Sequence, residues 1–137
     1  MNLSDILSSK PHFYLSKIDV YDKSFFSKSG KIELKAQDSL VISDFPESVC
    51  SVCFSYERKL TSIPEDIISL GVSFKILLNL NDEGKKLSSE ELLELAKKDS
   101  DINSVCSAKI SALISGISSF MASEYPIVTP PTPINLN

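Results

Sequence analysis

The side chains best suited to metal or redox chemistry are three cysteines and one histidine. Cys50 and Cys53 form the motif CSVC, a spacing used for zinc binding and for redox dithiols. Zinc pairs need a tight turn and redox pairs a helix N-terminus, but this pair lies in a strand-like segment. Side chains three residues apart on a strand point to opposite faces. We therefore expect structural cysteines, the alternative being a zinc site completed by Cys106 and His12.

Groups for covalent or phosphate chemistry are poorly represented. His12 follows Pro11 and has no neighbouring acid to orient it, as a Ser-His or Cys-His site requires. The serines lie outside any G-x-S-x-G nucleophile motif, and four scattered glycines cannot form a phosphate-binding loop. The sequence predicts a protein that is not an enzyme and needs no cofactor or metal.

Composition indicates one globular domain. The 137 residues are 42% hydrophobic and 23% charged, enough to bury a core. A net charge of −4 with dispersed lysines argues against nucleic-acid binding. Residues 1–10 lack the features of a signal peptide, and no apolar run reaches the roughly 20 residues that span a bilayer. Together with the odd number of cysteines, these features predict a cytoplasmic location.

Four segments have the hydrophobic patterns of strands, at residues 13–26, 31–42, 49–60 and 70–80. In the first, Phe13 and Leu15 are out of phase with Ile18 and Val20. A bulge near Ser16–Lys17 would place all four on one face. In the second, we expect an irregularity at Gln37–Asp38.

Two helices follow the strands. Ser88 and Glu91 form a capping box for a helix that ends near Lys98. A second helix is expected from about Ser104 to Met121, with one apolar side and one serine-rich side. The serine-rich side is expected to contact a second subunit. The predicted fold is α+β: a four-stranded antiparallel sheet with a long helix packed on one face.

The two ends of the chain differ in character. Residues 1–10 are expected to form a flexible N-terminal tail, and residues 11–137 a single domain. Within that domain, residues 126–137 form a proline-rich extended segment, called the arm below. The arm has two interpretations. It could dock into an SH3-like groove of a partner, or it could fold back over its own domain, which Ile127, Val128 and Ile134 favour.

The order of these segments resembles the SecB family of protein-export chaperones. The resemblance rests on KIDVYDKSFF for the first strand and on KIELKAQDSLVISD and VCSVCFSYERKL for the next two. SAKISALISGISSF is similar to the family's long helix, and EYPIVTPPTPINLN to the segment that follows that helix. Between the strands and the long helix, NSVCSAKI replaces the residues usual in the family.

The resemblance implies an oligomer, a dimer or a dimer of dimers, that holds unfolded polypeptides in apolar grooves without ATP. It also implies transfer of clients to the translocase motor SecA, with Asp22 as a candidate motor contact. Aromatic residues near predicted strand ends and turns are the candidate groove residues, unless they are plain core: Phe25, Phe26, Phe45, Phe120 and Tyr125. The alternative function is a SecB-like structural or regulatory protein, such as an antitoxin-type client chaperone or a binder of one folded partner, with no export role.

Overall fold

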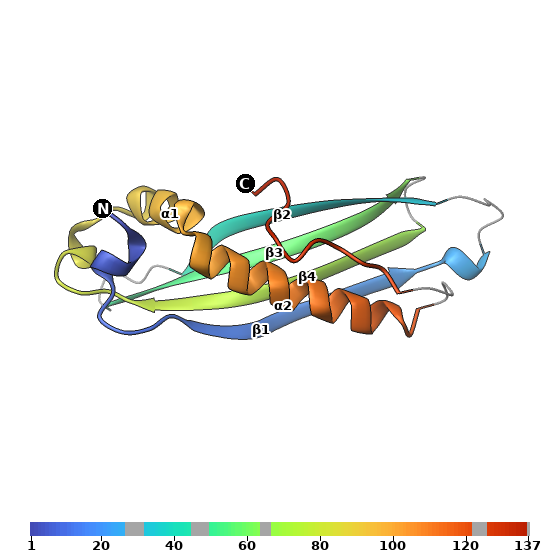
Figure 1. Ribbon diagram of the computed structural model, residues 1–137, viewed down its shortest axis with the longest axis horizontal. Helices are drawn as coiled ribbons and strands as arrows, with labels where there is room; N and C mark the ends of the chain where they lie inside the picture. Colours follow the sequence, from blue (N-terminus) through green and yellow to red (C-terminus); the bar gives the residue numbers. More distant parts are fainter. Residues whose placement is uncertain (27–31, 45–49, 64–66, 122–125, 137) are drawn as a thin grey trace.

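The computed structural model describes residues 1–26, 32–44, 50–63, 67–121 and 126–136; the side chains of Phe26 and Asp44 are outside this description. In these described ranges, four strands are followed by two α-helices (Figure 1). The strands are β1 (His12–Asp22), β2 (Glu33–Asp44), β3 (Ser51–Ile63) and β4 (Ile68–Asn79), and the helices are α1 (Ser89–Lys98) and α2 (Ser100–Ser118). The described residues also contain three short 3-10 helices, which are η1 (Leu3–Ile6), η2 (Ser24–Phe26) and η3 (Gly84–Lys86).

The four strands form one antiparallel sheet in the order β1-β4-β3-β2. Strict alternation along β3 buries Val52, Phe54 and Tyr56 on one face and leaves the intervening residues partly exposed. Both α-helices lie on this buried face (Figure 1). The prediction of an α+β fold built on a four-stranded antiparallel sheet is confirmed.

The predicted irregularity in the first strand is also present. The pairing register between β1 and β4 shifts between Leu15 and Lys17. Leu15 pairs with Phe74 and Ile18 with Val72, so the apolar residues before and after the bulge share the helix-bearing face. β2, in contrast, keeps a regular register through Gln37 and Asp38, and the irregularity expected there is wrong.

The helix boundaries follow from their caps. The Ser88 side chain accepts a hydrogen bond from the Glu91 amide, which confirms the capping box of α1. α2 begins at Ser100, earlier than predicted, because Asp99 caps it by accepting a bond of 2.9 Å from the Ile102 amide. Within the described parts of the chain, no helix has the length and apolar character to cross a membrane.

The N-terminal residues are part of the core. Leu3 and Ile6 of η1 are 2% and 0% exposed and belong to the main hydrophobic cluster. The Ile6 carbonyl accepts a 2.9 Å hydrogen bond from the Asn81 amide. The expectation of a flexible tail at residues 1–10 is therefore wrong, since its two buried apolar side chains tie η1 to the sheet.

Candidate functional site

The arm lies across the helix-bearing face of the sheet, in the space between α2 and β2 (Figure 1). Ile127 and Leu136 pack against the hydrophobic core. The Asp38 amide donates a 2.9 Å bond to the Ile134 carbonyl, which ties the arm to β2. The prediction that the arm folds back over its own domain is confirmed.

A fully buried ion pair lies beneath the arm. Asp38 of β2 and Arg58 of β3 are directly opposite each other in the sheet register, and both side chains are 0% exposed. Arg58 Nε donates to Asp38 Oδ1 at 2.7 Å, and Arg58 Nη2 donates to Asp38 Oδ2 at 2.9 Å. This two-point geometry is the strong form of an arginine–carboxylate pair.

The Asp38 carboxylate has two further donors. The Tyr56 hydroxyl donates to Oδ2 at 2.5 Å, and the Ile134 amide of the arm donates to the same oxygen at 3.0 Å. Burial, together with the hydrogen bond to Asp38, raises the pKa of Tyr56 well above its ordinary value. Tyr56 therefore remains a neutral donor across the physiological pH range.

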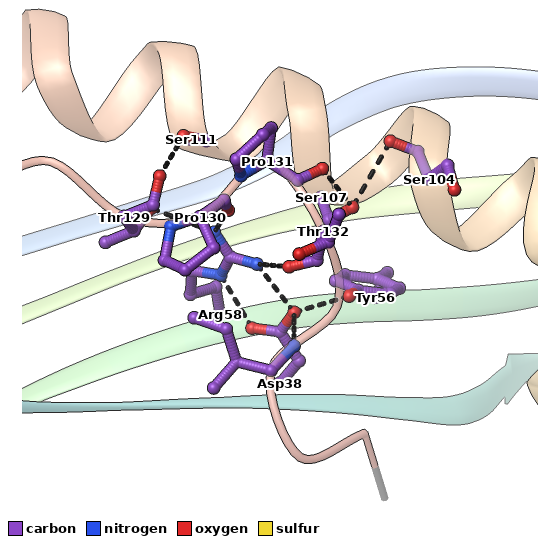
Figure 2. A network of polar contacts seen from close by, with 11 residues as sticks. Asp38, Tyr56, Arg58, Ser104, Ser107, Ser111, Thr129, Pro130, Pro131 and Thr132 are labelled. Atoms are coloured by element: carbon purple, nitrogen blue, oxygen red, sulfur yellow. Dashed lines mark hydrogen bonds and ion pairs between the residues drawn. The ribbon is translucent and has the colours of Figure 1, made fainter.

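The remaining donors of Arg58 bind the arm (Figure 2). Nη1 donates to Thr129 Oγ1 at 2.8 Å and to the Pro130 carbonyl at 2.6 Å, and Nη2 donates to the Thr132 carbonyl at 2.8 Å. With the two bonds to Asp38, all five N–H groups of the guanidinium are used. The arm thus completes the coordination of a buried charge.

The serine side of α2 holds the other edge of the arm (Figure 2). Ser111 Oγ donates to the Thr129 carbonyl at 2.6 Å, and Ser107 Oγ donates to the Pro131 carbonyl at 2.8 Å. Ser118 Oγ accepts a 2.6 Å bond from the Ile127 amide. The expectation that this serine side contacts a second subunit is wrong for these three residues, because the chain's own arm occupies them.

The predicted aromatic groove residues are only partly within the described chain. Phe25 of η2 is 80% exposed and Phe120, just beyond α2, is 93% exposed. η2 and the C-terminal end of α2 lie at the same end of the molecule (Figure 1). Phe26 ends η2, but its side chain is not described, and Phe45 and Tyr125 lie outside the described residues.

Asp22, the candidate motor contact, has a local structural role. Its Oδ1 accepts bonds of 2.9 Å from the Ser24 amide and 2.6 Å from the Ser24 hydroxyl. This arrangement is a side-chain turn that sets the path from β1 into η2. Asp22 therefore helps to position the exposed Phe25.

A row of apolar side chains is exposed along β1. Leu15, Ile18 and Val20 are 43%, 41% and 48% exposed, although they lie on the helix-bearing face of the sheet. β1 is an edge strand, paired to β4 on one side. The helices leave this edge of the buried face uncovered.

The three cysteines and the histidine differ in position and exposure. Cys50 is exposed, Cys53 is partly exposed on β3, and Cys106 is buried on α2. Burial raises the pKa of the Cys106 thiol to about 12. His12 is the exposed first residue of β1. Among the described residues, no three potential metal-binding side chains gather in one place.

Sequence reasoning did not single out the Asp38, Tyr56 and Arg58 network. A signal was present, because all three residues are in phase with buried apolar neighbours on their strands. Opposite charges on the buried phase of two adjacent strands favour a paired ion.

Comparison with known proteins supports the fold. No model of a known protein family matches the sequence, and neither does any curated protein. A solved structure that is similar is Mycobacterium tuberculosis Rv1957, a SecB-like chaperone in complex with a ChAD peptide from the Rv1956 HigA1 antitoxin. It is 12% identical, with a TM-score of 0.64 over 93% of this chain and 91% of that chain.

A second solved structure gives a weaker match. It is a protein of unknown function from Streptococcus agalactiae, 12% identical over 89% of this chain and 98% of that chain, with a TM-score of 0.32. A TM-score of 0.32 is too low to indicate a shared fold. The match to Rv1957, in contrast, shows that this chain has a SecB-like fold.

Proposed function

We propose that this protein is a non-enzymatic, SecB-like chaperone that binds non-native polypeptide segments. The observation that carries the proposal is a set of exposed apolar side chains: Phe25, Phe120 and, on the helix-bearing face, the β1 row of Leu15, Ile18 and Val20. Exposed apolar patches mark interaction surfaces. Unfolded chains supply the matching apolar side chains, because their own core residues are exposed.

The size of the surface suits weak, reversible binding. Burying one Phe side chain is favourable by about 1.5–3 kcal/mol, and three half-exposed aliphatic residues add a similar amount. Loss of translational freedom and ordering of the client offset several kcal/mol of this gain. We expect dissociation constants weaker than micromolar and toward the millimolar range, because 1 μM would need a net gain of about 8 kcal/mol; such weak binding lets a client be released without ATP.

The SecB-like fold supports the same proposal. The neighbour Rv1957 was solved with a peptide from an antitoxin, which shows peptide binding for that protein. We extend peptide binding to this chain, and with it a cytoplasmic location and an oligomeric state. Transfer of clients to a SecA-type motor through Asp22 is a further part of the proposal.

A dedicated client is the second candidate function. The antitoxin peptide bound to Rv1957 favours it, because one chaperone of this fold is paired with a named client. Affinity capture on the purified protein separates the two candidates. Many unrelated unfolded proteins would support a general chaperone, and one stoichiometric partner would support the dedicated role.

Suppression of aggregation tests the proposal directly. We expect the protein, at several-fold excess, to reduce light scattering by a chemically denatured client diluted into buffer. The variant Phe25→Ala/Phe120→Ala should lose most of this effect. A matched control is Val41→Ala/Ile63→Ala, since Val41 and Ile63 are 51% and 39% exposed on the opposite face of the sheet. Equal activity of both variants, or no suppression by the wild-type protein, would contradict the proposal.

A further inference from the structure

The arm and the surface beneath it are complementary in hydrogen-bonding type. From Thr129 to Thr132, every main-chain carbonyl accepts a hydrogen bond from Arg58, Ser107 or Ser111. Pro130 and Pro131 have no N–H group. Over residues 129–132 the arm therefore presents acceptors and the surface beneath it presents donors, whereas on either side of this stretch Ser118 and Asp38 accept bonds from arm amides.

The donors are spaced to suit an extended chain. Carbonyls 129 and 131 bind the serines of α2, while carbonyls 130 and 132 bind Arg58, so successive carbonyls alternate between the two sides (Figure 2). Residues four apart on an α-helix, such as Ser107 and Ser111, are separated by a rise of about 6.0 Å. Two residues of a polyproline-type chain advance about 6.2 Å. The two repeats match, so the helix acts as a ladder of donors for an extended segment.

Most side chains of residues 128–132 take no part in the hydrogen bonds to this surface. Pro130, Pro131 and Thr132 are exposed, and Val128 is 83% exposed. Thr129 is the exception, because its side chain is bound by Arg58 and the residue is 6% exposed. Recognition of residues 128–132 thus depends on the main chain and on one small hydroxyl residue, while Ile127 and Leu136 add apolar contacts at the two ends of the arm.

We propose that the surface beneath the arm, formed by Arg58, Ser107 and Ser111 and called the groove below, is a second polypeptide-binding site, and that the arm is its built-in occupant. The site takes an extended, proline-containing segment with a threonine at the position of Thr129. A client segment enters by displacing the arm. Use of the groove by clients rests on the function proposed above, whereas binding of a proline-containing segment added in trans does not.

Competition with the attached arm sets the apparent affinity of the groove for an added peptide. An attached segment has a high effective concentration, so an added peptide binds only the fraction of molecules whose arm is open. Thr129→Ala removes one bond between the arm and Arg58 and leaves every donor of the groove intact. We expect this change to increase the open fraction, and hence the affinity for the added peptide, about tenfold or more.

The probe is a fluorescent peptide with the sequence of residues 126–136, PIVTPPTPINL, measured by anisotropy against the full-length chain. We expect weak binding to the wild type and about tenfold tighter binding to Thr129→Ala. Val128→Ala is the matched arm control, because this exposed side chain should leave the affinity unchanged.

Substitutions in the groove, unlike the substitution in the arm, should lower the affinity for the added peptide. In the Thr129→Ala background, Ser107→Ala/Ser111→Ala removes two donors and should weaken peptide binding about tenfold. The control Ser104→Ala/Ser115→Ala makes the same change in helix propensity on the same helix. Equal peptide affinity of Thr129→Ala and Val128→Ala, or of the two serine pairs, would overturn the inference.

Displacement by an unfolded protein links the groove to clients. Reduced, carboxymethylated lactalbumin should release the bound peptide from Thr129→Ala. Suppression of aggregation without release of the peptide would overturn this inference and leave the proposed function standing. Peptide binding as expected, with no binding of the unfolded protein, would instead overturn the proposed function and leave the groove as a site for proline-containing segments.

Discussion

Arg58→Leu should be among the most destabilising single substitutions in this protein. Arg58 is fully buried, and it supplies two of the four hydrogen bonds that reach the Asp38 carboxylate. After the substitution, a buried carboxylate keeps only Tyr56 and the Ile134 amide as donors. Breaking a buried ion pair from one side costs about 3–5 kcal/mol.

The bonds between Arg58 and the arm add less to this cost. Pro130 and Thr132 are exposed, so their carbonyls can turn to water when the guanidinium is absent. The main loss is therefore the uncompensated charge of Asp38. Against a total stability of about 5–15 kcal/mol for a domain of this kind, a loss of 3–5 kcal/mol is a large share.

Urea unfolding followed by circular dichroism measures the effect. We expect the midpoint to fall with little change in the slope of the transition, since the surface exposed on unfolding is nearly the same. The double variant Asp38→Leu/Arg58→Leu should lose at least about 2 kcal/mol less than the sum of the two single variants, because it leaves no unpaired charge. A single-variant loss below about 1 kcal/mol, or simple additivity, would refute this reasoning.

Three further predictions concern other parts of the molecule. Ile6→Ala should lower the free energy of unfolding by about 2–4 kcal/mol because Ile6 is 0% exposed, and Met1→Ala, at a residue 72% exposed, should change it little. Since burial raises the pKa of the Cys106 thiol to about 12, the folded protein keeps a proton that the unfolded chain releases above about pH 8.5. Stability should therefore fall from about pH 8.5 to 12, by up to about 1.4 kcal/mol per pH unit, and Cys106→Ala but not Cys50→Ala should reduce this slope in urea titrations. Finally, light scattering at micromolar concentration should show a dimer or tetramer, with a strict monomer as the contrary result.

The strands were predictable because their patterns are local. The opposite phases of Leu15 and Ile18 are enough to predict the bulge in β1, since only an extra residue brings both to one face. The capping box at Ser88 is equally local. Boundaries that depend on tertiary contacts were predicted less accurately. α2 begins at Ser100, because Asp99 caps it and the side-chain amide of Asn103 donates to the carbonyls of Ala96 and Lys97.

The errors share one physical origin. The irregularity expected at Gln37–Asp38 is absent. Asp38 stays within a regular strand because Arg58 is directly opposite on β3, and this pairing depends on strand register. Leu3 and Ile6 were likewise assigned to a tail because ten residues of sequence contain no sign of the core that buries them.

The prolines of the arm have a second role that can be recognised only together with the surface beneath them. From sequence, prolines 130 and 131 indicate an extended path that cannot continue a helix. In the structure, the same absence of N–H groups leaves a row of acceptors facing Arg58, Ser107 and Ser111. A segment without prolines at these positions would carry two more amide groups, which would have to bind water because Arg58, Ser107 and Ser111 act here as donors. The prolines therefore suit the arm to its groove, and a segment that replaces the arm needs carbonyl groups at the same four positions.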